Sequence, residues 1–344
     1  MLTIVSVAYP FAMVDADPVG GAEQILSQLD RALVANGHRS IVIAQDGSTP
    51  AGRLVPLPRR EGEIDEAARA QVRRAIDDAI GEVIEREHVD LIHFHGIDFH
   101  EHLVSPGPPI LATLHLPLDW YPDRALHPAR PNTWLNPVSR NQVDRVPANA
   151  NFNLLPPIEN GVDVDRFPVG VRKENFAVAI GRICPEKGLH LALDAAAAAD
   201  WPLLLAGEVF PYPGHRAYFA EQIVPRLDRH RRWIGHVSGA KKCHILAAAR
   251  CVLVPSLVPE TSSLVAREAL AAGTPVIAFA TGALASVIEH GRTGFLVRDP
   301  DEMTRAIADC AALDGERCRQ AARERFSSRE MIRRYFSVYD HLAA

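Results

Sequence analysis

Residues 176–188 read Phe-Ala-Val-Ala-Ile-Gly-Arg-Ile-Cys-Pro-Glu-Lys-Gly and carry the strongest local signal in the sequence. An apolar run ends at Gly181 and a helix-like segment begins near Leu189, which predicts a strand, a turn and a helix in succession. Arg182 and Lys187 then place two cations at the carboxyl end of the strand, beside a helix N-terminus. Such a position suits a diphosphate, because backbone amides and the helix dipole add to the charge. A surface turn with a solvated arginine and lysine is the alternative.

The alternation of strand and helix continues outward from this segment. In the second half of the chain, short apolar runs predict strands at residues 176–181, 203–207, 233–235, 251–255 and 276–279. In the first half, the predicted strands are residues 2–8, 40–44, 90–95 and 110–115, with a long amphipathic helix over residues 64–88. Parallel strands are joined by helical crossovers, so the pattern predicts an α/β fold with doubly wound sheets.

Two such α/β units are predicted, because a segment rich in Pro, Gly, Asn and Asp interrupts the pattern at residues 154–168. At 344 residues, the chain also exceeds the roughly 250–300 residues at which a single core stops growing. We therefore expect one domain at residues 1–165 and another at 166–326. Residues 327–344 carry apolar side chains at helical spacing and predict a last helix, which packs either on its own domain or on the first one.

The composition restricts the class of protein. A net charge of -5 argues against a nucleic-acid-binding protein, although it leaves room for a local basic patch that meets a membrane. The five cysteines form no C-x-x-C pair, which is typical of a reduced, cytoplasmic protein. The apolar N-terminal run reads as a buried strand rather than a signal peptide, and no run of about 18 apolar residues predicts a transmembrane helix.

A second segment, residues 259–276, reads Pro-Glu-Thr-Ser-Ser-Leu-Val-Ala-Arg-Glu-Ala-Leu-Ala-Ala-Gly-Thr-Pro-Val. It predicts a loop and then a helix whose N-cap is Thr261 or Ser262. Glu260 would lie at the mouth of this helix, and Glu268 about two turns along it. An exposed helix with ordinary carboxylates is the alternative.

The mouth of this helix has a chemistry that matches the first segment. The amides of Ser262, Ser263 and Leu264 can meet an anionic ligand, because the first amides of a helix have no partner within it. The Glu268 carboxylate can take the two hydroxyls of a ribose, as carboxylates do in dinucleotide-binding folds. The two segments together therefore predict a site for a nucleoside diphosphate.

Together the two segments resemble the C-terminal domain of glycosyltransferase family 4, the retaining enzymes of the GT-B fold. That family carries a G-R-x-x-x-E-K-G turn, as in residues 181–188, and a P-E-x-x-G-x-x-x-x-E helix, as in residues 259–268. This chain departs from the second motif, since Ser262 and Ser263 stand where the family usually has an aromatic residue and a glycine. Further matches follow in the family's order at residues 20–23, 90–95, 113–115, 160–163 and 282–297.

The resemblance implies the GT-B architecture: two Rossmann-like domains that face each other across a cleft, and a C-terminal helix that crosses back to the first domain. Residues 1–165 would form the acceptor-side domain, and residues 166–326 the nucleotide-sugar-binding domain. In the second, Arg182 and Lys187 would neutralise the leaving diphosphate. Gly181 would let the backbone turn closely beneath it.

The resemblance also implies contacts to the rest of the donor. Glu260 would touch hydroxyls of the donor sugar, and Glu268 the ribose. His115 would hydrogen-bond the sugar near its reacting carbon, and the backbone around Gly235 would hold the edge of the base. The backbone amides of Gly20 and Gly21 would approach the distal phosphate and the acceptor.

The activity implied is the transfer of a sugar, with retention, from a UDP-sugar or GDP-sugar to a hydroxyl acceptor. The acceptor would be a glycan, a lipid-linked sugar or a small metabolite. No metal or other cofactor would be needed, since built-in cations take the place of a metal at the diphosphate. We expect a cytoplasmic enzyme, compatible with a peripheral contact to the inner face of a membrane. The alternatives are a sugar-nucleotide epimerase of the same fold and an inactive nucleotide-sugar-binding subunit.

Other patterns are weaker candidates for chemistry. Residues 93–102 contain four histidines, two of them on one strand face, but no tetrahedral ligand spacing or cysteine accompanies them. The D-x-D triplets at residues 15–17 and 163–165 are compatible with a metal and are interpreted as loop acids. Cys184 is interpreted as a small filler of its turn rather than a nucleophile.

Overall fold

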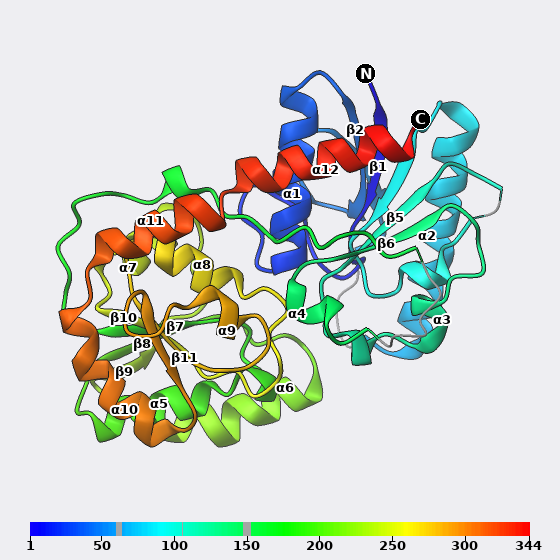
Figure 1. The fold of residues 1–344 in the computed structure, drawn as a ribbon. Helices are drawn as coiled ribbons and strands as arrows, with labels where there is room; N and C mark the ends of the chain where they lie inside the picture. Colours follow the sequence, from blue (N-terminus) through cyan, green and yellow to red (C-terminus); the bar gives the residue numbers. More distant parts are fainter. Residues whose placement is uncertain (60–63, 105, 147–152) are drawn as a thin grey trace. The chain divides into compact units, whose positions relative to one another are not determined.

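The structure, a computed structural model, describes residues 1–59, 64–104, 106–146 and 153–344 (Figure 1). By its internal contacts the chain divides into two compact units, residues 1–160 with 329–344, and residues 161–328. Each unit contains a six-stranded sheet in which neighbouring strands are parallel. The predicted α/β class is confirmed.

The sheet of the first unit has the order β3-β2-β1-β4-β5-β6. Its strands are β1 (Thr3–Val7), β2 (Arg39–Gln45), β3 (Arg53–Leu57), β4 (Leu91–Phe94), β5 (Ile110–Leu114) and β6 (Thr133–Pro137). Its helices are α1 (Gly21–Ala35), α2 (Glu66–Arg86), α3 (Asp123–Leu126), α4 (Arg140–Val143) and the short turns η1 (Phe99–Glu101) and η2 (Leu118–Trp120). The strand order reverses between β1 and β4, and ligands of such sheets bind where the order reverses.

Strands β3 and β6 were not among the predicted strands. Both are the outermost strands of the sheet, and Leu135 of β6 also forms an isolated bridge to Leu154 on its outer side. Each contains a proline, Pro56 or Pro137, which lowers the strand signal of a sequence and is tolerated at an edge. The polar residues and prolines of these two segments therefore weaken the strand pattern in the sequence. In the structure the segments are strands because they pair with a buried neighbouring strand.

The last helix, α12 (Ser328–Leu342), belongs to the first unit over residues 329–344. Figure 1 shows it in red, and its side chains contact His93 of β4, Thr113 of β5 and Asn136 of β6. Its buried side chains recur at helical spacing, at Met331, Tyr335, Tyr339 and Leu342. An apolar stripe thus fixes the end of the chain to the first sheet.

The sheet of the second unit has the order β12-β11-β10-β7-β8-β9, which reverses between β7 and β10. Its strands are β7 (Ala177–Ile180), β8 (Leu203–Ala206), β9 (Arg231–Trp233), β10 (Cys251–Val254), β11 (Val276–Phe279) and β12 (Gly294–Val297). Apolar side chains on its two faces form two buried clusters. The reversal predicts a ligand site at the carboxyl ends of β7 and β10.

Helices cover both faces of this second sheet. They are α5 (Leu189–Ala198), α6 (Pro213–Tyr218), α7 (Gly239–Ala248), α8 (Leu264–Ala271), α9 (Leu284–Val287), α10 (Pro300–Asp309) and α11 (Gly315–Arg325). Shorter turns are η3 (Val164–Arg166), η4 (Pro185–Lys187), the π-helical η5 (Phe219–Ile223), η6 (Val224–Arg226) and η7 (Cys310–Ala312).

One predicted strand is displaced in the structure. β9 ends at Trp233, whereas the sequence pattern placed the strand at residues 233–235. The φ angle of Gly235 is 72°, a left-handed value that ends the extended backbone. The charged residues that begin β9 concealed its true start.

Two further findings concern the whole of the described chain. None of its helices combines the length and the apolar character that crossing a membrane requires. The five cysteines are buried thiols, none of them in a disulfide.

Candidate active site

The turn at residues 181–188 follows β7 and is anchored to both neighbouring strands. The Gly181 amide donates to the Ala206 carbonyl at the end of β8, 3.1 Å away. At its other end, Gly188 has a φ of 60°, and a Cβ there would lie 2.2 Å from the Pro255 carbonyl oxygen beyond β10. No other residue fits Gly188, so the turn is held at the point where the strand order reverses.

Lys187 and Glu260 form the central ion pair of this site. The Lys187 Nζ lies 2.6 Å from Oε1 of Glu260, whose same oxygen also accepts from the Ser256 hydroxyl. Burial alone would raise the pKa of the Glu260 carboxyl, but Lys187, Ser256 and Arg182 together hold the pKa below its usual range. Glu260 is therefore a buried, ionised acceptor, and its charge is balanced by the cation expected to meet a phosphate.

The backbone of Glu260 is fixed by Gly282. A Cβ on Gly282, whose φ is 57°, would lie 2.3 Å from the Glu260 carbonyl oxygen, and the Ala283 amide donates to that oxygen at 2.7 Å. This contact explains physically why a glycine follows β11 and its turn. It also places Glu260 beside the turn that leads to α9.

Helix α8 begins one residue later than predicted. Its N-cap is Ser263, not Thr261 or Ser262, and Ser263 has left-handed backbone angles of φ 52° and ψ 72°. Its hydroxyl makes no capping bond, since a side chain reaches the first amides of a helix from extended backbone. A left-handed serine costs about 1–2 kcal/mol, and strain of this kind is typical of functional sites.

The two serines at this helix mouth are buried, with exposed fractions of 4% for Ser262 and 7% for Ser263. Within the part of the chain that the structure describes, neither hydroxyl has a hydrogen-bond partner. Leu264, the first residue of α8, is partly buried. The start of α8 therefore contains buried hydroxyl groups that could hydrogen-bond a ligand.

Glu268 lies in the middle of α8 and pairs with a lysine that the sequence did not indicate. Lys242 Nζ on α7 lies 2.6 Å from Oε1 of Glu268, and each side chain is 12% exposed. A carboxylate has about four acceptor positions, so Lys242 can orient Glu268 and leave one oxygen for a ribose. Lys241 and Lys242 are consecutive basic residues on α7, and no sequence pattern indicated that either of them lies at the site.

Arg267, next to Glu268, is wholly buried. Its Nε donates to the Ser262 carbonyl at 3.1 Å, and its guanidinium carbon lies 4.5 Å from the centre of the Phe326 ring. A charged side chain in the core is uncommon unless it is paired. Arg267 thus supports the helix mouth from beneath.

Three glycines meet at the carboxyl ends of β7, β8 and β9. The Gly207 amide donates to the Gly235 carbonyl at 2.9 Å, and Gly207 packs on the Gly181 carbonyl so closely that a Cβ would lie 1.8 Å from it. Trp233 donates its indole N–H to the Gly207 carbonyl at 3.0 Å. No atom would approach a Cβ on Gly235 within 4 Å, so its backbone is open to a planar group.

In the first unit, the predicted residues lie around the β1–β4 reversal. Gly20 is the N-cap of α1, and Gly21 is its first residue. A Cβ on Gly20 would lie 1.9 Å from Oε2 of the buried Glu23, so this carboxylate lies against the start of α1. The two glycines thus begin a helix whose first amides have a carboxylate beside them.

His115 follows β5 and contacts a second histidine. Its Nε2 lies 3.1 Å from Nδ1 of His95, and the two rings stack with centroids 5.3 Å apart. Burial lowers the pKa of His115 to about 3, and burial with the neighbouring histidines lowers the pKa of His95 well below its usual value. Both rings are therefore neutral at physiological pH.

A buried network continues from these rings to the C-terminal helix. His93 Nδ1 lies 2.8 Å from the Tyr339 hydroxyl, and its Nε2 lies 2.8 Å from Thr113 Oγ1. Thr113 Oγ1 lies 3.1 Å from the Tyr335 hydroxyl, which accepts from Asn136 at 3.0 Å. Protein groups thus occupy both nitrogens of His93, which explains its burial by structure rather than by a metal.

The D-x-D triplets both form local turns. Asp15 accepts from the amide of Asp17 at 2.7 Å, and Asp163 accepts from the amide of Asp165 at 3.2 Å. Such bonds are typical of acidic residues that open a turn.

We expect acid to destabilise the protein through its neutral histidines. The unfolded chain binds protons at His115 below pH 6.5, whereas the folded chain does so near pH 3. The unfolded state therefore binds more protons between these values, and the free energy of unfolding falls as the pH falls. From pH 8 to pH 5 the loss is about 2 kcal/mol for His115 alone, measurable by urea unfolding at both pH values.

His115→Asn should reduce this pH dependence, because the variant has one neutral imidazole less to protonate on unfolding. His88→Gln is the matched control, since the His88 side chain is 87% exposed and should leave the dependence unchanged. An unchanged slope in His115→Asn would show that His115 is protonated to the same extent in both states.

We compared the chain with protein-family models and with known proteins. A model described as Glycosyltransferase Family 4 matches residues 19–153, and one described as Glycosyl transferases group 1 matches residues 174–312. A curated relative, phosphatidyl-myo-inositol mannosyltransferase of Mycobacterium leprae, is 27% identical over 93% of this chain and 90% of its own length.

Solved structures share the fold. Sucrose-phosphate synthase from Thermosynechococcus elongatus matches with a TM-score of 0.82 and 20% identity, over 99% of both chains. Anabaena HepE, solved in complex with UDP and glucose, matches with a TM-score of 0.78 and 18% identity, over 99% of this chain and all of the other.

The two family models together span most of the chain, and the structural matches cover both units, so the predicted GT-B architecture is confirmed. The chain therefore belongs to the glycosyltransferases of family 4, also described as group 1, and is a glycosyltransferase of the GT-B fold.

Proposed function

We propose that the enzyme transfers a sugar from a nucleoside-diphosphate sugar to a hydroxyl acceptor, with retention of the anomeric configuration and without a metal. The observation that carries this proposal is the Lys187–Glu260 pair, 2.6 Å long, beside the mouth of α8 in the second unit. Arg182 acts electrostatically on the same carboxylate. Cations and helix amides gathered at the reversal of a parallel sheet favour a diphosphate.

The residues of the second unit then have distinct roles. Arg182 and Lys187 stabilise the charge that develops on the leaving diphosphate, assisted by the amides of residues 262–264. Glu260 accepts from hydroxyls of the donor sugar. Glu268, oriented by Lys242, binds the ribose.

The binding of the remaining donor atoms uses backbone groups. Gly181 keeps the backbone beneath the diphosphate compact, and the open backbone at Gly235 holds the edge of the base. In the first unit, Gly20 and Gly21 present the first amides of α1 to the distal phosphate and the acceptor. His115 hydrogen-bonds the donor sugar.

Retention is supported by the chemistry of His115. An inverting enzyme needs a base that removes the acceptor proton from the face opposite the leaving group. A histidine whose pKa is about 3 accepts a proton poorly near pH 7, so it suits a hydrogen-bonding role better than a general base. The leaving diphosphate can instead take the acceptor proton on its own face.

The printed names of similar proteins support a choice of donor and acceptor for this proposal. HepE was solved with UDP and glucose, which supports a UDP-sugar, while a GDP-sugar remains within the proposal. The mannosyltransferase relative is named for a phosphatidylinositol, which favours a lipid-linked acceptor over a glycan or small metabolite. The five buried thiols favour a reducing cytoplasm, with a peripheral membrane contact where a lipid is the acceptor.

The proposal is tested by donor hydrolysis, which needs no known acceptor. The enzyme is incubated with α-linked UDP- and GDP-sugars in excess EDTA, and the anomeric proton of the first sugar released is followed by NMR before mutarotation. We expect the α-anomer and full activity with chelator. Release of the β-anomer would contradict retention, and activity restored by Mn²⁺ or Mg²⁺ alone would contradict metal independence.

A further inference from the structure

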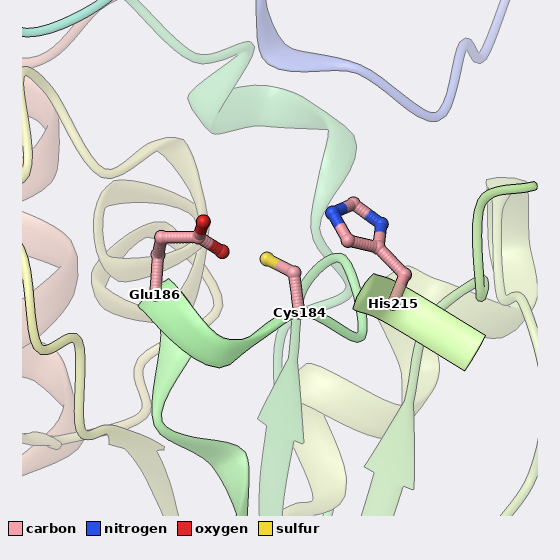
Figure 2. A group of neighbouring side chains, drawn as sticks. All are labelled: Cys184, Glu186 and His215. Atoms are coloured by element: carbon pink, nitrogen blue, oxygen red, sulfur yellow. The ribbon is translucent and has the colours of Figure 1, made fainter. Parts of the chain in front are cut away.

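The second unit holds a cluster of three side chains whose chemistry differs from the rest of the site. Cys184, Glu186 and His215 each offer a ligand atom, and these atoms lie within 4.8 Å of one another. In Figure 2, the Cys184 thiol lies between the Glu186 carboxylate and the His215 ring, and both point toward it. Two of the residues come from the turn at residues 181–188, and the third comes from α6.

Each member of the cluster carries an atom of a kind that binds metal ions. Cys184 is 1% exposed, its thiol donates to the Arg182 carbonyl at 3.6 Å, and burial raises the pKa of the thiol to about 11. The Nδ1 of His215 is buried and has no hydrogen-bond partner among the described residues. The His215 ring lies beside the thiol and the carboxylate, so one of its nitrogens completes a set of three metal-binding atoms.

We propose that Cys184, Glu186 and His215 bind a divalent ion of the zinc type. A thiolate, an imidazole and a carboxylate are the ligand set of Zn²⁺, and three protein ligands leave one tetrahedral position for solvent. The thiolate and the carboxylate supply two negative charges, which match the charge of the ion. Binding releases the thiol proton to solvent.

The three side chains must move slightly closer together to bind an ion. Ligands about 2.0–2.3 Å from a tetrahedral ion lie about 3.5 Å from one another, so the side chains must approach by about an ångström. Glu186 and His215 are partly exposed and can rotate to do so, whereas Cys184 is fixed by burial. The ion would tie α6 to the turn that carries Arg182 and Lys187.

Nearby charge acts on the cluster in both directions. The Arg182 guanidinium interacts with the Cys184 thiol and with His215. Its charge favours the thiolate form of Cys184 and opposes a bound cation. Ligation by Cys184 therefore requires the ion to displace the thiol proton.

The experiment titrates the purified full-length chain, kept reduced, with Co²⁺ and follows the absorption spectrum. Ligation by thiolate gives a charge-transfer band in the near ultraviolet, and tetrahedral Co²⁺ gives intense visible bands. Zn²⁺ added afterwards should abolish both, since it binds such sites more tightly than Co²⁺. This readout does not depend on catalysis, so it fails or succeeds independently of the proposed glycosyl transfer.

Variants assign the bands to this cluster. We expect Cys184→Ser to abolish the charge-transfer band and His215→Gln to weaken Co²⁺ binding at least tenfold. The matched controls are Cys243→Ser, another buried thiol, and His236→Gln, an exposed histidine of the same unit. Thermal unfolding of each variant shows that it is folded.

Two outcomes overturn the proposal. One is the absence of a thiolate band at saturating Co²⁺. The other is a band that persists in Cys184→Ser or disappears in Cys243→Ser, which would place the ion at another cysteine. His215→Gln that binds Co²⁺ as tightly as the unmodified chain would remove the imidazole from the site.

Discussion

Lys187→Ala should lower the turnover of donor hydrolysis by about 100-fold at saturating donor. The variant removes a cation from the place where charge develops on the leaving diphosphate, so its loss appears in the transition state more than in the ground state. The measurement is the initial rate of sugar release over a range of donor concentrations. Lys241→Ala, at an exposed lysine on α7, is the matched control and should keep normal turnover.

A second effect of this variant must be separated from the first. Lys187 is the partner of the buried Glu260, so Lys187→Ala leaves a carboxylate without its counter-charge and destabilises the unit. The double variant Lys187→Ala with Glu260→Gln removes that charge as well. We expect it to regain thermal stability but not turnover. Recovery of turnover in the double variant would show that Lys187 serves Glu260 rather than the diphosphate.

Arg267→Ala should lower the free energy of unfolding by about 3 kcal/mol. The side chain is wholly buried, so its removal leaves a cavity above Phe326 and takes the donor from the Ser262 carbonyl. Urea unfolding measures the change. Arg317→Ala, on α11, is the matched control because that side chain is 61% exposed and should leave the unfolding midpoint unchanged.

This prediction also separates a structural role from a direct contact with substrate. If Arg267 supports the helix mouth from beneath, Arg267→Lys should retain part of the stability by restoring charge and length. An Arg267→Ala variant with unchanged stability and lost donor hydrolysis would instead make Arg267 a ligand of the donor.

Much of the fold could be predicted because its central strands have a clear pattern within their own sequence. β1, β7 and β10 are short apolar runs that end in turn residues, and each could be recognised without knowing its neighbours. The edge strands β3 and β6 are different, because their prolines and polar residues form strands by pairing with a buried partner. The information that makes them strands therefore comes from the neighbouring strand and cannot be read from the segment itself.

The candidate site could be proposed from the sequence to the same extent and for the same reason. The turn at residues 181–188 and the two glutamates follow from spacing along one segment each. The partners of those residues do not, since Lys242 meets Glu268 across 26 residues and Tyr339 meets His93 across 246. Spacing along a chain says nothing of such contacts, and the left-handed Ser263 arose from packing rather than from its own propensity.

The return of α12 to the first unit has a consequence for the order in which the protein is made. Residues 161–328 form a contiguous unit that can close as soon as its last residue leaves the ribosome. The first unit, although synthesised earlier, has no partner for His93 Nδ1 until Tyr339 emerges, and the loop between them must be closed. The domain that begins the chain therefore completes its core last, after the one that follows it.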